Sequence, residues 1–553
     1  ASREEMSALI EGEVTRARDR LVEEIDRAVQ DPTLTQRALS ERLAHAGLLP
    51  MFGFPTRVRL LHTRIPRRAF PWPPEHGTVD RAIDIAISQF APGSETVKDK
   101  QVHTAAGVVR LAPMGREVRA ESGFVPEIGT PHVWVGRCGA CHHLRYTEVR
   151  REPPPAGVAP TKQPCPVCGM EEYQEIDARE PTGFFATFDP RDYDGLFEFA
   201  PRVSRPSLAL TGTSEPEPVP GSQVMVSCIT DRIVTLNDNG GAGGFDFFPS
   251  TLLQQNAVHQ NGLAAWAVFD NTTANERGGY SFGRQTGEGH RISLLDRRRT
   301  DILLIDLPSW PQGVYADPRR PEGRAAWYSF GFMLRKAAAV FLDVRTTELD
   351  VGMRTYSSDD GLRAQVFLSD HLENGAGYCS RLGEREVFRE LLACARDMVM
   401  GDHGWVGQEH AGTCGVSCPR CLREYSNLSY HGLLDWRLAH DMLGISLNGD
   451  SALIDLRAQL PDGSENPWLP LVEGGGDVLS PPAAAFGFQV SHEPNLPRAF
   501  ENEGQTLVEC HPLWTDEHPM LVAARRRFGP QMRTVNPFRI ARRPGDIASM
   551  SLG

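Results

Sequence analysis

Apolar positions change their spacing several times along this chain, and each change predicts a different kind of element. Residues 3–30 carry apolar side chains at helical spacing among many charged ones, which predicts a surface amphipathic helix. Residues 80–90 also read as helical. From 182 to 249, short apolar runs alternate with turns rich in proline, glycine and aspartate, a pattern typical of β-strands.

The middle of the chain alternates strands with helices. The pattern predicts a short apolar strand over 300–307 and a buried helix, apolar on most faces, over 325–344. A second strand is expected at 363–370, and further helices at 383–400 and 431–443. Because 553 residues also exceed what one hydrophobic core can hold, the sequence predicts an α+β multidomain protein.

Four cysteines ahead of the β-rich stretch have the spacing of a zinc ribbon. Cys138 and Cys141 form one Cys-x2-Cys pair, and Cys165 and Cys168 form a second pair after 23 intervening residues. Two such pairs can clamp one zinc ion, since zinc prefers four tetrahedral thiolate or imidazole ligands. We expect a structural site, because four protein ligands leave no open position for a substrate.

A second cluster follows the helix predicted at 383–400. Cys414, Cys418 and Cys421 lie close together, and His410 lies four residues upstream. These side chains predict a second structural Zn²⁺ site, with its fourth ligand left ambiguous by the spacing. Disulfides fit less well, because the total of eleven cysteines is odd and cytosolic thiols stay reduced.

Composition narrows the range of functions. The formal net charge of −13 argues against broad, non-specific coating of nucleic acid. None of the four lysines follows the glycine that a phosphate-binding loop requires, so we expect no ATP hydrolysis by this chain alone. Apolar runs stay shorter than a membrane span, and the sequence therefore predicts a cytoplasmic protein without a membrane segment.

Basic and aromatic residues interleave at the end of the second cluster. Arg420 and Arg423 are followed by Tyr425 and Tyr430. Guanidinium groups can bind phosphates while aromatic rings stack on unpaired bases, so this segment is a candidate DNA contact. The alternative is that the same side chains hold the zinc loop against the helix that begins near Leu433.

Several sequence blocks in the chain match those of known families. The middle of the chain contains, in order, TDILLIDL, AAWYSFGFMLRKAAAVFLDV, QVFLSDHLENGAGYC and CGVSCPRCLREYSNLSYHGLLDWRLA. Together these blocks resemble the zinc-binding region at the C-terminal end of MrfA-like DNA repair helicases. With MFGFPTRVR near the start, the chain from 40 to 445 also resembles the DrmB family, the helicase-associated subunits of the DISARM phage-defence system.

The resemblance implies a division of labour between two proteins. In DISARM the helicase motor belongs to DrmA, and the zinc-binding module belongs to DrmB. The resemblance therefore implies a non-catalytic partner that docks on a DrmA-like helicase subunit and helps to bind single-stranded or overhang phage DNA. The helicase family's zinc is thought to have four cysteine ligands, whereas three match here. His410, Cys379 and Cys394 are thus the candidates for the fourth ligand, and we favour His410.

These patterns divide the chain into five expected regions. They are an N-terminal helical, helicase-associated region (1–125), the zinc ribbon (126–180), a β-rich region (181–295), a helicase-associated α/β zinc-binding domain (296–458) and a small C-terminal α+β region (459–553).

Two rival functions stay open on the sequence. An independent metal-dependent nuclease or hydrolase would use the turn at Asp370, His371 and Glu373, or the region from Cys510 to His518. Against this, acidic turn residues more often bind local amides, and a lone cysteine is usually a small buried residue. The other rival is a pure protein scaffold that contacts no nucleic acid.

Overall fold

The computed structural model describes most of the chain. The described residues are 57–66, 68–121, 123–193, 205–208, 215–253, 263–359, 361–372, 377–460 and 463–551, with residue 43 and parts of 21–30. The amphipathic helix predicted over 3–30 therefore lies largely outside the described residues.

The described residues between 57 and 125 form mainly strands, so the prediction of a helical region over 1–125 is wrong for its described part. Strand β4 (Gln101–Val108) pairs with β12 (Phe184–Ala186) and with β18 (Leu263–Ala267), which lie far along the chain. Helix α3 (Ile83–Gln89) matches the helix expected near 80–90 and packs its buried residues into the same core.

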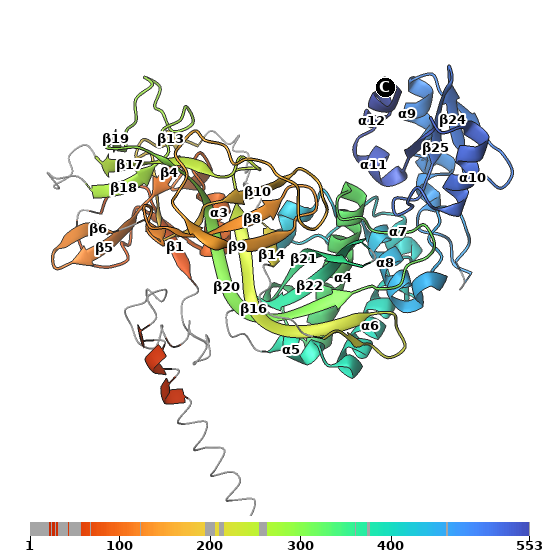
Figure 1. Ribbon diagram of the computed structural model, residues 1–553, viewed down its shortest axis with the longest axis horizontal. Helices are drawn as coiled ribbons and strands as arrows, with labels where there is room; N and C mark the ends of the chain where they lie inside the picture. Colours follow the sequence, from red (N-terminus) through yellow and green to blue (C-terminus); the bar gives the residue numbers. More distant parts are fainter. Residues whose placement is uncertain are drawn as a thin grey trace, which may run out of the picture.

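We call this unit the β lobe (Figure 1). Because its strands come from the sequence before and after the zinc ribbon, the regions predicted at 1–125 and 181–295 form one unit rather than two. Its other strands are β1 (Val58–His62), β2 (Thr78–Ala82), β3 (Glu95–Lys98), β5 (Arg110–Met114), β6 (Glu117–Glu121), β7 (Phe124–Val125), β11 (Ala178–Pro181), β13 (Arg191–Asp192), β17 (Phe245–Leu252) and β19 (Gly283–Gln285).

The ribbon is a separate three-stranded sheet in the order β10-β8-β9. Strand β8 (His132–Cys138) pairs antiparallel with β9 (Leu144–Arg151) on one side and with β10 (Tyr173–Ile176) on the other. The two cysteine pairs lie in the turns at the ends of these strands.

Two long strands connect the β lobe to the α/β domain (Figure 1). Strand β16 (Met225–Asn237) pairs with β20 (His290–Asp306) along its whole length, so both strands belong to the two units at once. Strand β22 (Gly361–Asp370) extends the sheet beside β20, and β21 (Leu349–Ser358) follows it. Two short strands, β14 (Arg205–Leu208) and β15 (Glu217–Pro218), pair with β16.

Helix α4 (Pro321–Leu342) is the buried helix that the apolar pattern predicted, and it packs on β21 and β22. A side chain at Gly331 would come within 2.6 Å of Val351 and Val366, so this close approach of helix to sheet requires glycine. Helices α6 (Arg385–Met400) and α8 (Trp436–Asn448) cover α4 in turn.

The last hundred residues share the core of the α/β domain. One hydrophobic cluster contains buried residues from Val219 to Ile547, including Trp436 of α8 and Trp468 beyond the predicted boundary. The boundary expected at 458/459 is therefore not a boundary between cores. The C-terminal elements are α9 (Ser480–Ala485), β23 (Gln489–Ser491), β24 (Ala499–Asn502), β25 (Gln505–Glu509), α10 (Pro519–Phe528), β26 (Arg533–Val535), α11 (Pro537–Arg542) and α12 (Asp546–Ser551).

The fold class follows the prediction: a mixed α/β multidomain protein with two cysteine clusters. None of the described helices combines the length and the hydropathy that crossing a bilayer requires.

Candidate metal centres

The four ribbon cysteines converge in space. The Sγ atoms of Cys138 and Cys168 are 3.7 Å apart, and those of Cys141 and Cys165 are 3.8 Å apart. A tetrahedral zinc ion with bonds of about 2.3 Å to sulfur requires sulfur–sulfur separations of about 3.8 Å. The four thiols therefore fit one zinc ion.

Local hydrogen bonds act on the ribbon thiols in different ways. The amide of Cys141 donates to Sγ of Cys138, and the amide of Val167 donates to Sγ of Cys165. The hydrogen bond from the Cys141 thiol, together with those from nearby amides, outweighs burial and lowers the pKa of Cys138 to about 5. The same hydrogen bond raises the pKa of Cys141, and burial raises that of Cys165 to about 11. The thiolate is the form that binds zinc, so Cys138 is the thiol that this environment prepares for the metal.

The second cluster has the same tetrahedral spacing. Sγ of Cys418 lies 3.6 Å from Nε2 of His410 and 3.8 Å from Sγ of Cys421. Sγ of Cys414 lies 3.9 Å from Sγ of Cys421. His410 comes from the short helix α7 (Gln408–Ala411), one turn before the first cysteine. The spacing left the fourth ligand open, and the geometry assigns it to His410.

A contact behind the ring orients His410. Its Nδ1 lies 2.8 Å from the carbonyl oxygen of Trp405, so Nδ1 carries the hydrogen and donates it. The lone pair of Nε2 then points at the three sulfur atoms, as in metal sites whose histidine is held by an outer partner. Cys379 and Cys394 lie elsewhere: the thiol of Cys394 faces a backbone carbonyl of α4, and the carbonyl of Cys379 accepts from Cys228.

Lys336 fastens the second zinc loop to α4, a role that cysteine spacing does not reveal. Its Nζ donates to the carbonyl oxygens of Cys421 at 2.8 Å, Arg420 at 3.0 Å and Pro419 at 3.4 Å. Lysine is rare in this chain, and Lys336 lies within a largely apolar helix. A rare lysine within an apolar helix was the feature of the sequence that could have pointed to this role.

The Lys336→Met variant is expected to lower the free energy of unfolding by about 1–3 kcal/mol, because it keeps the apolar stem but leaves three loop carbonyls without their donor. Urea unfolding of the full chain measures the effect. The control is Lys100→Met, since Lys100 is exposed and its loss should change stability by about 0.5 kcal/mol or less. Equal stability of the two variants would contradict the role assigned to Lys336.

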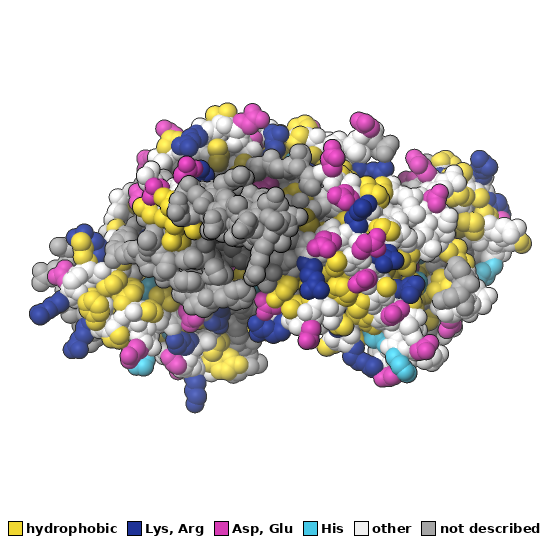
Figure 2. Space-filling view, turned by 90° about the horizontal axis from the view of Figure 1, so that it is seen from below, with side chains coloured by type: hydrophobic (Ala, Val, Ile, Leu, Met, Phe, Trp, Pro, Cys, Tyr) yellow, Lys and Arg dark blue, Asp and Glu magenta, His cyan; other side chains and the backbone are white. Residues whose placement is uncertain are grey.

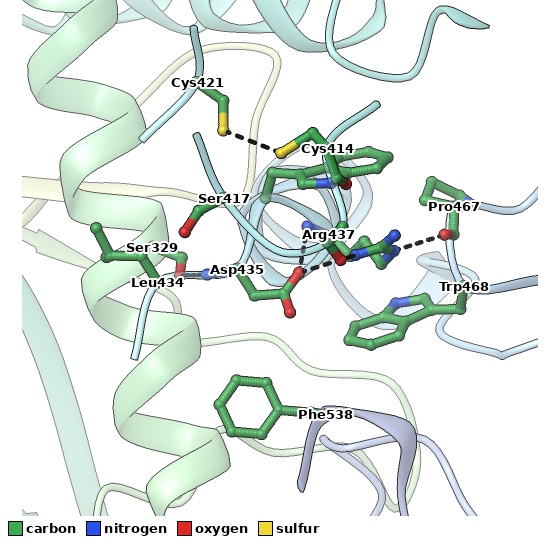
Figure 3. Close-up of polar contacts among 12 residues, drawn as sticks. Ser329, Cys414, Ser417, Cys421, Leu434, Asp435, Arg437, Pro467, Trp468 and Phe538 are labelled. Atoms are coloured by element: carbon green, nitrogen blue, oxygen red, sulfur yellow. Dashed lines mark hydrogen bonds and ion pairs between the residues drawn. The ribbon is translucent and has the colours of Figure 1, made fainter. Parts of the chain in front are cut away.

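A buried ionic cluster lies beside the second site and joins it to the C-terminal region (Figure 3). Arg437, at the start of α8, donates from Nη1 to the carbonyl of Gly415 and from Nε to the carbonyl of Pro467, both at 2.8 Å. The carboxylate of Asp435 accepts from the amide of Arg437 at 3.1 Å and lies 3.3 Å from the guanidinium of Arg542. The zinc loop, α8 and α11 are thus held by one set of charges.

The four candidate DNA contacts have different environments. Tyr425 is 84% exposed at the start of a short 3-10 helix (Tyr425–Tyr430). Arg420 is exposed and pairs with Glu409 at 2.6 Å, while Arg423 donates to the hydroxyl of Ser417 at 2.9 Å. These three side chains remain candidates.

Tyr430 is not a candidate DNA contact, and the prediction that its ring stacks on bases is wrong. The residue is 5% exposed, and its ring packs against those of Tyr328 and Phe332, with centroids 4.8 and 4.9 Å away. It therefore belongs to the interface between the zinc loop and α4, whereas the alternative account expected contact with the helix that begins near Leu433.

The Asp370 turn serves the fold. Its carboxylate is buried and accepts the amides of Gly377, Tyr378 and Cys379 at 2.9–3.2 Å, which caps the start of a short helix, α5 (Tyr378–Leu382). The neighbouring His371 pairs with Asp350 at 3.0 Å. Glu373 lies outside the described residues. The contacts of Asp370 favour a structural role over a metal site.

The Cys510–His518 region shows no nucleophile beside a base. Burial raises the pKa of Cys510 to about 12, so this thiol stays protonated at neutral pH. His511 is fully buried; its Nε2 lies 3.1 Å from Asp441, and its Nδ1 accepts the amide of Leu513. His518 stacks on Trp514 instead. Cys510 therefore has no base positioned to activate it, and His511 is already engaged by Asp441 and Leu513.

Residues 330–422 match the family model described as the MrfA Zn-binding domain. The match runs from α4 through Cys421, and thus includes the whole second cluster. Together with the geometry of both cysteine sets, it confirms the prediction of two structural zinc ions.

Two further proteins are distantly similar to this chain. Druantia protein DruE of Escherichia coli (strain UMEA 4076-1) is 25% identical over 451 residues, which cover 75% of this chain and 22% of that protein. A solved structure of the DUF1998 helicase MrfA bound to DNA has 11% identity and a TM-score of 0.26, over 47% of this chain and 27% of that one. The chain spans about a quarter of the length of each of these relatives. It therefore contains an MrfA-type zinc-binding domain and is distantly similar to a Druantia protein.

Proposed function

We propose that this chain is a non-catalytic, zinc-binding partner of a DNA helicase in bacterial antiviral defence, in the manner of DrmB in the DISARM system. The observation that carries the proposal is the MrfA Zn-binding domain at 330–422 in a sequence that has no phosphate-binding loop. The similarity to a Druantia protein supports the link with defence. The motor would belong to a separate, DrmA-like subunit.

In this proposal the second zinc site is a rigid support for a DNA-contacting loop. Its ligands and Lys336 fix the loop, and the exposed ring of Tyr425 follows Arg420 and Arg423 closely in sequence. On the face seen in Figure 2, basic and acidic side chains are interspersed over the described residues. Binding would therefore depend on local stacking and a few phosphate contacts, and less on a broad positive field.

Co-expression with a DrmA-like helicase tests the partnership. We expect the two proteins to purify together, and ATP hydrolysis stimulated by single-stranded DNA to occur in the helicase and in the complex. The chain alone should show no turnover above a mock purification. Turnover by the isolated chain, or failure of the two proteins to associate, would contradict the proposal.

Replacing Tyr425 by alanine is expected to weaken single-stranded DNA binding by the complex about tenfold, since one base–aromatic stack contributes roughly 1–3 kcal/mol. Arg420→Ala with Arg423→Ala should reduce the slope of log affinity against log salt by about 1.4. Fluorescence anisotropy over a salt series measures both effects.

The matched control removes two exposed arginines of α6, Arg389 and Arg396, which also pair with neighbouring acids. It changes the net charge equally and should leave affinity near that of the wild type. If the loop variants bind DNA as tightly as the control in an intact complex, the chain is a pure scaffold at this site.

A further inference from the structure

The zinc ribbon lies between the β lobe and the α/β domain and contacts both of them (Figure 1). Different parts of the ribbon make the two sets of contacts. Strand β8 and the long segment between the cysteine pairs contact the β lobe, whereas the turn of the first pair packs on the α/β domain.

The contacts to the β lobe involve the turn between β16 and β17 and the start of β17. Arg137 forms an ion pair with Asp238, and the amide of Gly157 donates to the carboxylate of Asp246 at 3.0 Å. A side chain at Gly243 would lie 2.2 Å from Pro160, so the glycine-rich turn is shaped to receive this segment. The 23-residue segment between the cysteine pairs therefore forms part of the interface with the β lobe.

The contacts to the α/β domain involve the metal site itself. The hydroxyl of Thr355, on β21, donates to Sγ of Cys141 at 3.6 Å. The carbonyl of the same Thr355 lies 3.3 Å from Nδ1 of His143, and Arg324 of α4 donates to the carbonyl of Ala140 at 3.3 Å. Thr355 is 1% exposed and Cys141 is fully buried, so water does not compete for this hydrogen bond.

We propose that the first zinc ion locks the β lobe and the α/β domain together through the ribbon, and that Thr355 is an outer-shell residue of this metal site. The ion joins the turn that contacts the α/β domain to the segment that contacts the β lobe. A three-stranded sheet of this size has little core of its own and depends on its metal for rigidity. The inference goes beyond the proposed function and depends on neither the helicase nor DNA.

The Thr355→Val variant of the full chain tests the outer-shell role. Valine keeps the shape of threonine and removes the donor to Cys141. Outer-shell partners typically change metal affinity 10–100-fold, so one of the two ions should transfer to a chromogenic chelator about tenfold faster or more. The control is Thr235→Val, a buried strand threonine (5% exposed) outside both metal sets. Wild-type kinetics for both ions in Thr355→Val would overturn this role.

The Cys165→Ser variant tests the locking role by hydrogen exchange. Cys165 belongs to the second cysteine pair, whereas the hydroxyl of Thr355 donates to Cys141 of the first pair. We expect protection to fall in the ribbon and also at 236–246 and 353–357, while the second zinc loop at 410–421 keeps its protection. Exchange changes confined to 132–176 would show that the ribbon does not lock the two units. The Thr355→Val variant leaves all four zinc ligands in place, so its result stands even if Cys165→Ser fails to fold.

Discussion

Replacing Cys421 by serine is expected to unfold the α/β domain together with the C-terminal region, and not the zinc loop alone. A structural zinc ion contributes on the order of 10 kcal/mol of folding free energy, which is comparable with the roughly 5–15 kcal/mol that stabilises a typical protein. Cys421 is fully buried in the hydrophobic cluster that runs from Val219 to Ile547. Loss of its thiolate therefore removes a ligand from the centre of that core.

Thermal unfolding followed by circular dichroism, with zinc analysis of the same sample, measures this effect. The main transition should disappear or move down by about 10 °C or more, and about one zinc ion per chain should be lost. Cys394→Ser is the matched control, because Cys394 is half-buried on α6 and belongs to neither metal set. If both variants unfold like the wild type, the second site is not structural.

Replacing Asp435 by alanine is expected to have the second largest effect, a loss of about 3–5 kcal/mol of unfolding free energy. Asp435 is 1% exposed, caps α8 and faces the guanidinium groups of Arg437 and Arg542. Its removal leaves buried Arg437 and half-buried Arg542 without their carboxylate, while the zinc ligands stay in place. Urea unfolding should show the loss with two zinc ions still bound in the folded protein.

Asp402→Ala is the control for this substitution, because Asp402 is exposed in the turn after α6. It should change stability by about 0.5 kcal/mol or less. A small effect of Asp435→Ala would mean that the cluster in Figure 3 relaxes readily, and that α11 is not held to the zinc-binding domain by charge.

Helix α4 contacts both metal sites and the start of α8. Near its first turn Arg324 contacts the turn of the first cysteine pair, and three turns later Lys336 contacts the second zinc loop. Between them, Ser329 accepts the amide of Asp435 at the start of α8. A single buried helix thus positions both metal sites relative to each other.

The sequence predicted the metal sites well because their chemistry is local. Each cysteine pair lies within one tight turn, and His410 lies one helical turn before Cys414, so spacing alone brings these ligands near each other. The apolar run of α4 was equally visible, since a helix buried on most faces leaves a continuous apolar signal.

Contacts between distant segments could not be predicted in this way. Strand β4 finds its partners in β12 and β18, and no local pattern specifies such pairing. The Pro/Gly-rich stretch after α8 resembles a linker, yet Trp468 within it is fully buried and donates to Asp441 of α8. Proximity to arginines suggested a surface role for Tyr430, whereas tertiary packing turned its ring into the core.

The zinc content of the full chain shows directly whether both clusters hold a metal ion. Purified without added metal and analysed by inductively coupled plasma mass spectrometry, the protein should contain about two zinc ions per chain, one for each tetrahedral set. One ion or fewer in a folded, homogeneous sample, or a different metal at either set, would contradict the account.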